Sequence, residues 1–226
     1  MSQRKYNFVQ TEFYHIYNRG TDKRPIFLDV GDYRRFQTLL FVANTDKAIS
    51  LKDLYRNNQG PFDLAAENKM VALGAYCLMP NHFHLLVTPR TDNGVSVFMQ
   101  KLSTAYSMYF NKKYERSGSL FEGKFKSQLA IEDRYLKYLF SYIHLNPVKL
   151  LQHDWKENGI KDKKEAEKYL NSYTFSSYFD HIGKERMESK ILDLTAFPNY
   201  FKGFFDAERE VTDWLTLPEA LPRAEV

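Results

Sequence analysis

Residues 70–89 of this chain read MVALGAYCLMPNHFHLLVTP. The run from Met70 to Leu78 is almost continuously apolar, Met79, Pro80 and Asn81 carry a turn signal, and a second extended run begins at His82. Two such runs joined by a short polar and proline-containing connection are typical of a β-hairpin. We therefore expect two antiparallel strands over these residues.

Upstream of this hairpin, the sequence predicts one strand and one helix. FYHIYNR, over 13–19, alternates large apolar and polar side chains, as a strand does. Asp32 is the expected N-cap of the helix that follows, in which Phe36, Leu39, Leu40 and Ala43 recur at helical spacing. The stretch 44–69 predicts an irregular connection.

Downstream of the hairpin, the pattern predicts a long helix from Gly94, a strand over 120–131 and a helix over 132–145 that Pro147 ends. The resulting order β-α-β-β-α-β-α predicts an α+β protein with a ferredoxin-like β-α-β-β-α-β core, whose antiparallel sheet is covered by helices on one face. We divide the chain into a domain over 1–150 and a mostly helical appendage over 151–226.

Composition narrows the class of protein. Of the 226 residues, 43% are hydrophobic, which is enough for a buried core. We find no apolar run long enough to span a membrane and no hydrophobic signal segment in MSQRKYNFVQ, so we expect a cytoplasmic protein. The single cysteine, Cys77, excludes an intrachain disulfide and a multi-cysteine metal site. The net charge is +8 over 1–150 and −4 over 151–226, which suits a first domain that meets a polyanion.

His82 and His84 form the first candidate site. They are separated by one residue in a predicted strand, so both imidazoles project to the same side of the sheet. Two such histidines can chelate a divalent ion and leave positions open for water or substrate. Ordinary histidines with hydrogen-bonded rings are the alternative.

The predicted helix over 132–145 supplies the second candidate site. Tyr135, Tyr138, Tyr142 and Asn146 share one face of it. A tyrosine can be a covalent nucleophile if a metal or a base assists it, and a bound metal polarises a phosphoryl oxygen. Together with the histidines, this face predicts a phosphodiester-cleaving site. Without them, an aromatic core stripe that ends in an asparagine cap is the alternative.

Basic residues provide candidate DNA contacts. They interleave with Phe121 and Phe125, whose faces could stack unpaired bases or belong to the core. The candidate DNA-binding residues are Arg19, Lys112, Lys113, Arg116, Lys124 and Lys126.

These motifs together resemble the REP-associated tyrosine transposases, a branch of the single-tyrosine HUH transposases of bacterial insertion sequences. The resemblance rests on four segments: AYCLMPNHFHLLVTP over 75–89, RSGSLFEGKFKS over 116–127, YLKYLFSYIHLNPVK over 135–149 and TFSSY over 174–178. It spans roughly residues 13–180.

The resemblance implies an HUH catalytic domain over 1–150 in which His82 and His84 bind Mg²⁺ or Mn²⁺. Tyr142 would attack single-stranded DNA next to a hairpin, forming a 5′-phosphotyrosine link and freeing a 3′-hydroxyl. Asn146 falls where the wider superfamily often places a glutamine as the third metal ligand.

Two other functions use the same fold: a non-catalytic regulator that binds hairpin DNA, and a relaxase or replication-initiator nickase. The intact His82, His84 and Tyr142 argue against the regulator, which needs none of them. The sequence does not decide between a monomer and a homodimer, nor does it assign a role to residues 44–69 and 180–226.

Overall fold

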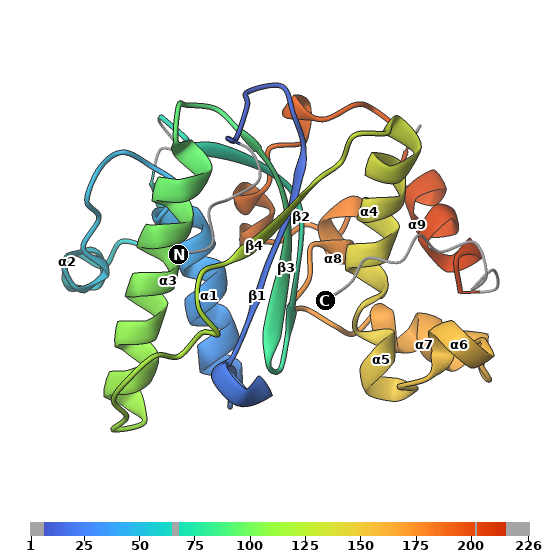
Figure 1. Ribbon diagram of the computed structural model, residues 1–226, viewed down its shortest axis with the longest axis horizontal. Helices are drawn as coiled ribbons and strands as arrows, with labels where there is room; N and C mark the ends of the chain where they lie inside the picture. Colours follow the sequence, from blue (N-terminus) through green and yellow to red (C-terminus); the bar gives the residue numbers. More distant parts are fainter. Residues whose placement is uncertain (1–6, 65–67, 202, 216–226) are drawn as a thin grey trace.

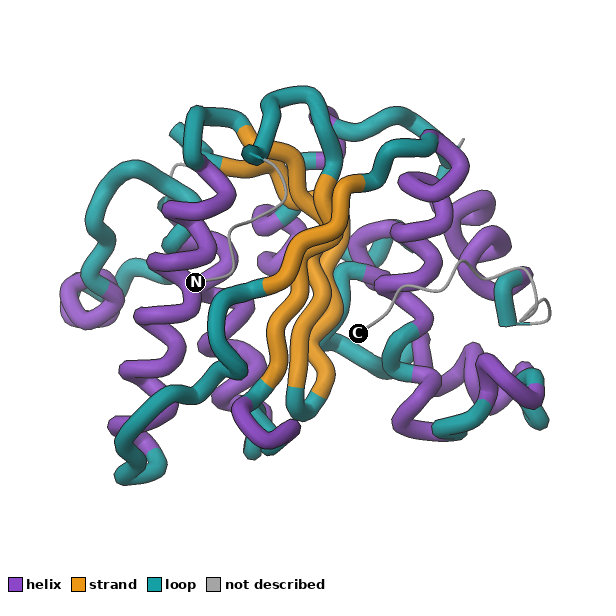
Figure 2. The backbone as a smooth tube through the Cα atoms, viewed as in Figure 1, coloured by secondary structure: helices purple, strands orange, loops and turns teal. Residues whose placement is uncertain are grey.

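The computed structural model describes residues 7–64, 68–201 and 203–215. One four-stranded antiparallel sheet, in the order β2-β3-β1-β4, runs through the molecule with helices on both sides (Figures 1 and 2). The core elements are β1 (Tyr14–Arg19), α1 (Val30–Val42), β2 (Val71–Met79), β3 (His82–Pro89), α3 (Gly94–Lys113), β4 (Lys126–Leu129) and α4 (Asp133–Leu145). This order and pairing confirm the predicted ferredoxin-like core.

Shorter elements make up the rest of the described chain. The remaining α-helices are α2 (Leu51–Arg56), α5 (Val148–Leu151), α6 (Trp155–Asn158), α7 (Lys163–Leu170), α8 (Tyr178–His181) and α9 (Phe204–Asp213). The 3₁₀ turns lie at Thr21–Lys23, Pro61–Asp63, Met187–Ile191 and Leu194–Ala196. None of the described helices has the length and apolarity that crossing a membrane requires.

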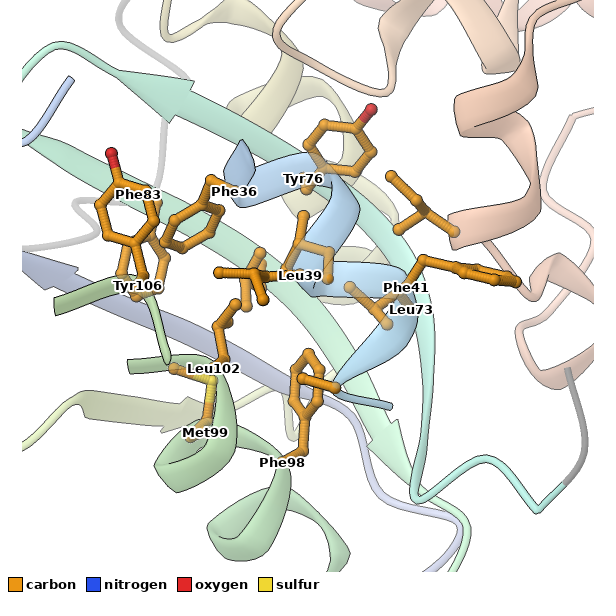
Figure 3. Close-up of a cluster of buried hydrophobic side chains, with 14 of the residues drawn as sticks. Phe36, Leu39, Phe41, Leu73, Tyr76, Phe83, Phe98, Met99, Leu102 and Tyr106 are labelled. Atoms are coloured by element: carbon orange, nitrogen blue, oxygen red, sulfur yellow. The ribbon is translucent and has the colours of Figure 1, made fainter. Parts of the chain in front are cut away.

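The two faces of the sheet bury different helices. Phe83 on β3 packs against Phe36 of α1, with ring centroids 5.1 Å apart, inside a large cluster formed with α1 and α3 (Figure 3). Leu86, on the same strand, points to the face opposite Phe83 and lies in a second cluster with α4. Because successive strand residues point to opposite faces, the burial of Phe83 beneath α1 turns His82 and His84 toward α4.

The strand register defines the neighbours of these histidines. His82 is paired with Arg19 on β1 and Met79 on β2, and His84 is paired with Tyr17 and Cys77. Paired residues in an antiparallel ladder present their side chains on the same face. Both histidines therefore lie at the turn end of the central hairpin, flanked by β1.

Two local predictions are wrong in detail. Asp29, rather than Asp32, is the N-cap of α1, and Asp32 is its reciprocal partner in a capping box. The predicted strand over 120–131 is reduced to Lys126–Leu129, since Gly123 adopts a left-handed φ of 67° and only an isolated bridge joins Phe121 to Gly20. Phe121 is buried in the core. Of its two predicted roles, base stacking and core packing, the structure shows the second.

The appendage covers the outer edge of β2. Leu78 N–H donates to the Phe175 carbonyl at 3.0 Å, and Ser177 N–H donates to the Tyr76 carbonyl at 2.9 Å. Ser177 Oγ also accepts from Tyr76 N–H at 2.8 Å and lies 2.8 Å from His144 Nε2. This segment, which includes the TFSSY motif, satisfies backbone groups that an edge strand would otherwise leave open. The division at residue 150 stays a prediction.

Candidate active site

His82 and His84 form a pair at the turn end of β3. Their ring centroids are 5.0 Å apart with perpendicular planes. His84 is fully buried, whereas His82 is partly exposed. The pair therefore joins a solvent-accessible imidazole to one fixed in the interior.

Each histidine has its Nδ1 atom engaged. His82 Nδ1 lies 2.6 Å from the side-chain oxygen of Asn81, and His84 Nδ1 lies 2.9 Å from His15 Nε2. The Asn81 oxygen only accepts, so His82 Nδ1 carries the proton and its Nε2 keeps a lone pair. If His84 likewise donates from Nδ1 to His15, its Nε2 also offers a lone pair. That atom is buried and has no hydrogen-bond partner among the residues that the structure describes.

His15 is the member of the site that sequence reasoning missed. It is fully buried on β1, two residues from Tyr17, and its ring centroid lies 5.1 Å from that of His84. The alternation of FYHIYNR places His15 and Tyr17 on one face of a strand. The register that sets this face beside His84 is a long-range property, which the sequence pattern did not reveal.

Tyr142 projects from α4 onto the histidines. Its ring centroid is 5.7 Å from that of His84 and 5.7 Å from that of His15, edge-on to both. The structure thus brings Tyr142 beside His84, one of the two histidines of the predicted pair. Burial raises the pKa of the Tyr142 phenol, so the group is neutral at pH 7 and requires assistance to react as a phenolate.

Tyr138 lies one turn earlier on α4 and is oriented differently. Its ring contacts Trp214 of the C-terminal segment at 5.0 Å between centroids, and its centroid is 5.8 Å from that of Tyr142. His144 lies on another face of α4, where its Nε2 is 2.8 Å from Ser177 Oγ, and it points away from the site.

Asn146 offers one uncommitted oxygen. Its side-chain N–H donates to the Tyr142 carbonyl at 2.9 Å. Its Oδ1 is buried, and within the described ranges of the chain this oxygen has no hydrogen-bond partner. Within residues 7–64, 68–201 and 203–215, no group of three or more His, Cys, Asp or Glu side chains is placed to hold a metal ion together. A divalent ion at this place would therefore have two imidazole nitrogens and, if Asn146 reaches it, one amide oxygen. With the His84 proton on Nδ1, these residues fit such an ion, because each then has a free lone pair.

The electrostatic environment keeps the histidines neutral. Burial, reinforced by the charge of Lys156, lowers the pKa of His15 to about 3. Burial and the charges of Lys149 and Arg19 lower the pKa of His82 to about 4, and burial holds the pKa of His84 well below its ordinary value. At neutral pH all three rings can act as hydrogen-bond acceptors or ligands.

The candidate DNA-binding residues occupy two places. Arg19 is bonded to Glu122, and the ammonium of Lys126 lies 6.0 Å from the centroid of the Tyr17 ring, so both border the histidine pair. Lys112, Lys113 and Arg116 lie at the C-terminal end of α3, at the same end of the molecule as the β2–β3 turn (lower edge of Figure 1). The exposed Lys124 lies between these two places in the chain.

Lys113 is paired with two carboxylates, whereas Arg19 is paired with one. Its ammonium contacts Asp29 Oδ2 and Asp32 Oδ1 at 2.7 Å each. The fully buried carboxylate of Asp32 also accepts from Tyr109 and Tyr114. Lys113 is therefore already neutralised by the carboxylates at the start of α1.

Comparisons with known proteins support the resemblance. Residues 36–146 match the model of the family described as "Transposase IS200 like". A putative REP-associated tyrosine transposase of Haemophilus influenzae is 33% identical over 86 residues, which cover 33% of this chain. The match covers 48% of that protein, so the chain spans about half the length of this curated relative.

A solved REP-associated tyrosine transposase bound to a REP hairpin shares the fold. It is 14% identical, covers 89% of this chain and 100% of its own, and superposes with a TM-score of 0.50. The predicted resemblance to the REP-associated tyrosine transposases is confirmed.

We predict that stability falls with acidification well above the range in which carboxylates titrate. Burial lowers the pKa of five histidines: His15, His82, His84, His144 and His181. Below pH 6.5 the unfolded chain binds protons that the folded chain does not, so the free energy of unfolding decreases as pH falls. Each histidine that stays neutral contributes a loss of about 2 kcal/mol between pH 6.5 and 5.

Urea unfolding at pH 7, 6 and 5 measures this dependence. Asp29 and Asp32 have lowered pKa values and remain ionised throughout this window, so they do not contribute. His144→Gln should flatten the profile. An equal free energy of unfolding at pH 7 and pH 5 would contradict the prediction.

Proposed function

Because residues 36–146 match the IS200-like transposases, we propose that this protein is a tyrosine transposase that cleaves and rejoins single-stranded DNA next to a hairpin. The observation that carries the proposal is the convergence of Tyr142 and His84, whose ring centroids are 5.7 Å apart. Since the proposed substrate is DNA, we propose that the protein acts in the cytoplasm.

In the proposed reaction, the Tyr142 oxygen attacks the scissile phosphorus. The bond to the 3′ oxygen breaks, the phenolic proton is lost, and the 3′ oxygen takes up a proton to leave as a hydroxyl. A 5′-phosphotyrosine link conserves the phosphodiester energy, so a later attack by a 3′-hydroxyl can rejoin DNA and release the tyrosine.

The proposed cofactor is Mg²⁺ or Mn²⁺, bound by His82 Nε2 and His84 Nε2, with Asn146 Oδ1 as the third candidate ligand. Such an ion polarises a phosphoryl oxygen and stabilises developing negative charge. His15 and Asn81 hold the two imidazoles by their Nδ1 atoms, an arrangement that typically orients metal-binding histidines.

The proposed DNA substrate is a hairpin with an adjoining single strand. Arg19 and Lys126 lie beside the histidine pair on β1 and β4, and the exposed Lys124 precedes Lys126 in the chain. Lys112 and Arg116 extend the basic surface toward α3. Lysine and arginine side chains bind phosphates irrespective of sequence, so this surface would position the strand while the hairpin sets its register.

Covalent trapping tests the nucleophile. The protein is incubated with Mn²⁺ and a pool of single-stranded hairpin oligonucleotides with randomised flanks, and DNA adducts are resolved on denaturing gels. We expect an adduct that Tyr142→Phe abolishes, and that His82→Ala reduces about 100-fold, a typical cost of removing one transition-state-stabilising group.

Tyr138→Phe is the matched control, since it removes a neighbouring phenol from the same helix. It should retain the adduct. Loss in Tyr138→Phe with retention in Tyr142→Phe would place the nucleophile on the other tyrosine. Tight hairpin binding without any adduct would indicate a non-catalytic regulator instead.

Salt dependence tests the DNA surface. Lys124→Ala and Lys126→Ala should each weaken hairpin binding and reduce the slope of log affinity against log salt by about 0.7, the value for one lost phosphate contact on a single strand. Lys113→Ala is the control. The Lys113 ammonium is bonded to two carboxylates. The salt-dependence slope of the Lys113→Ala variant should therefore equal that of the unmodified protein.

Fluorescence anisotropy at several salt concentrations gives these slopes. Unchanged slopes for both Lys124→Ala and Lys126→Ala would mean that this loop and strand face away from DNA.

A further inference from the structure

Lys156 brings a cation from the appendage to the face of Tyr142. It lies on the four-residue helix α6, and its ammonium is 4.1 Å from the centroid of the Tyr142 ring. The preceding residue, Trp155, is fully buried in a cluster with Leu145 and Tyr178. Trp155 thus anchors α6 against the end of α4 and holds Lys156 beside the candidate nucleophile.

The ammonium of Lys156 has no anionic partner in the described part of the chain. No carboxylate there lies within ion-pair distance of it. Burial and the neighbouring charge of Lys149 lower its pKa to about 7, against the weaker opposing effect of Glu157. A partly desolvated cation without a counter-charge is costly, and an incoming anion would offset that cost.

We propose that Lys156 binds the scissile phosphate beside Tyr142. This inference rests on the proposed function, which delivers one anion to this place: the phosphodiester that Tyr142 attacks. An ammonium there would neutralise a non-bridging oxygen and stabilise the charge that develops as the phenolic oxygen bonds to phosphorus. The active site would then include a group beyond residue 150.

Two simpler roles for the Lys156 ammonium are removal of the phenolic proton of Tyr142 and a purely structural contact with its ring. The ammonium lies over the face of the Tyr142 ring, and within the described residues it forms no hydrogen bond with the hydroxyl, so it is not placed to remove the phenolic proton. A purely structural cation–π contact would stabilise the fold without affecting the chemical step. Kinetic measurements therefore separate a structural role of Lys156 from phosphate binding.

The kinetic test compares Lys156→Met, which keeps the apolar stem, with Lys156→Arg, which keeps the charge. Single-turnover adduct formation with Mn²⁺ and a cleaved member of the hairpin pool should fall about 100-fold in Lys156→Met and less than about 10-fold in Lys156→Arg. The affinity for DNA should change only a few-fold. Lys164→Met, an exposed lysine of the same appendage, should react like the unmodified protein.

A labelling test decides the inference even if no adduct forms. Lysines of Tyr142→Phe are briefly acetylated with acetic anhydride and quantified by mass spectrometry, with and without the hairpin pool. Lys156 should be protected at least several-fold, and Lys164 should not. A pool with uncharged methylphosphonate flanks should not protect Lys156.

The outcomes separate the two proposals. Absence of an adduct from the unmodified protein defeats the proposed function alone. Equal acetylation of Lys156 with and without DNA, equal protection by charged and uncharged flanks, or full-rate cleavage by Lys156→Met would each overturn the phosphate-binding role of Lys156.

Discussion

The alternation of side chains along β3 is the constraint from which the site follows. Phe83 is fully buried against α1 and α3, so its two neighbours must face α4. A shift of one residue in register would place both imidazoles in the large apolar cluster and remove Phe83 from it, which is strongly unfavourable. The same hydrophobic core that stabilises the sheet therefore fixes where His82 and His84 point.

Local patterns were sufficient to predict the hairpin over 70–89, the helix that carries Tyr142 and the ferredoxin-like order. The shared face of Tyr142 and Asn146 also follows from helical spacing alone. The sequence did not reveal His15 or Lys156, because each reaches the site through a long-range contact: β1 pairing with β3, and Trp155 docking α6 onto α4. Asp32 was misplaced as a cap because Asp29, three residues earlier, is an equally good one, and the capping box uses both.

The candidate site combines neutral histidines with a neutral phenol. Burial keeps His15, His82 and His84 unprotonated and raises the pKa of the Tyr142 phenol, so the protein alone does not generate a phenolate at neutral pH. In the proposed reaction, a divalent ion and the ammonium of Lys156 would both supply positive charge to the phosphate. The arrangement is consistent with a site that becomes active only when metal and DNA are both bound.

The central claim is that the Nδ1 bonds of His82 and His84 free their Nε2 atoms to hold one ion next to Tyr142. Anomalous diffraction from crystals grown with Mn²⁺ tests it most directly. We expect a single strong peak within coordination distance of both Nε2 atoms. A peak that contacts neither imidazole, or none at saturating Mn²⁺, would contradict the account.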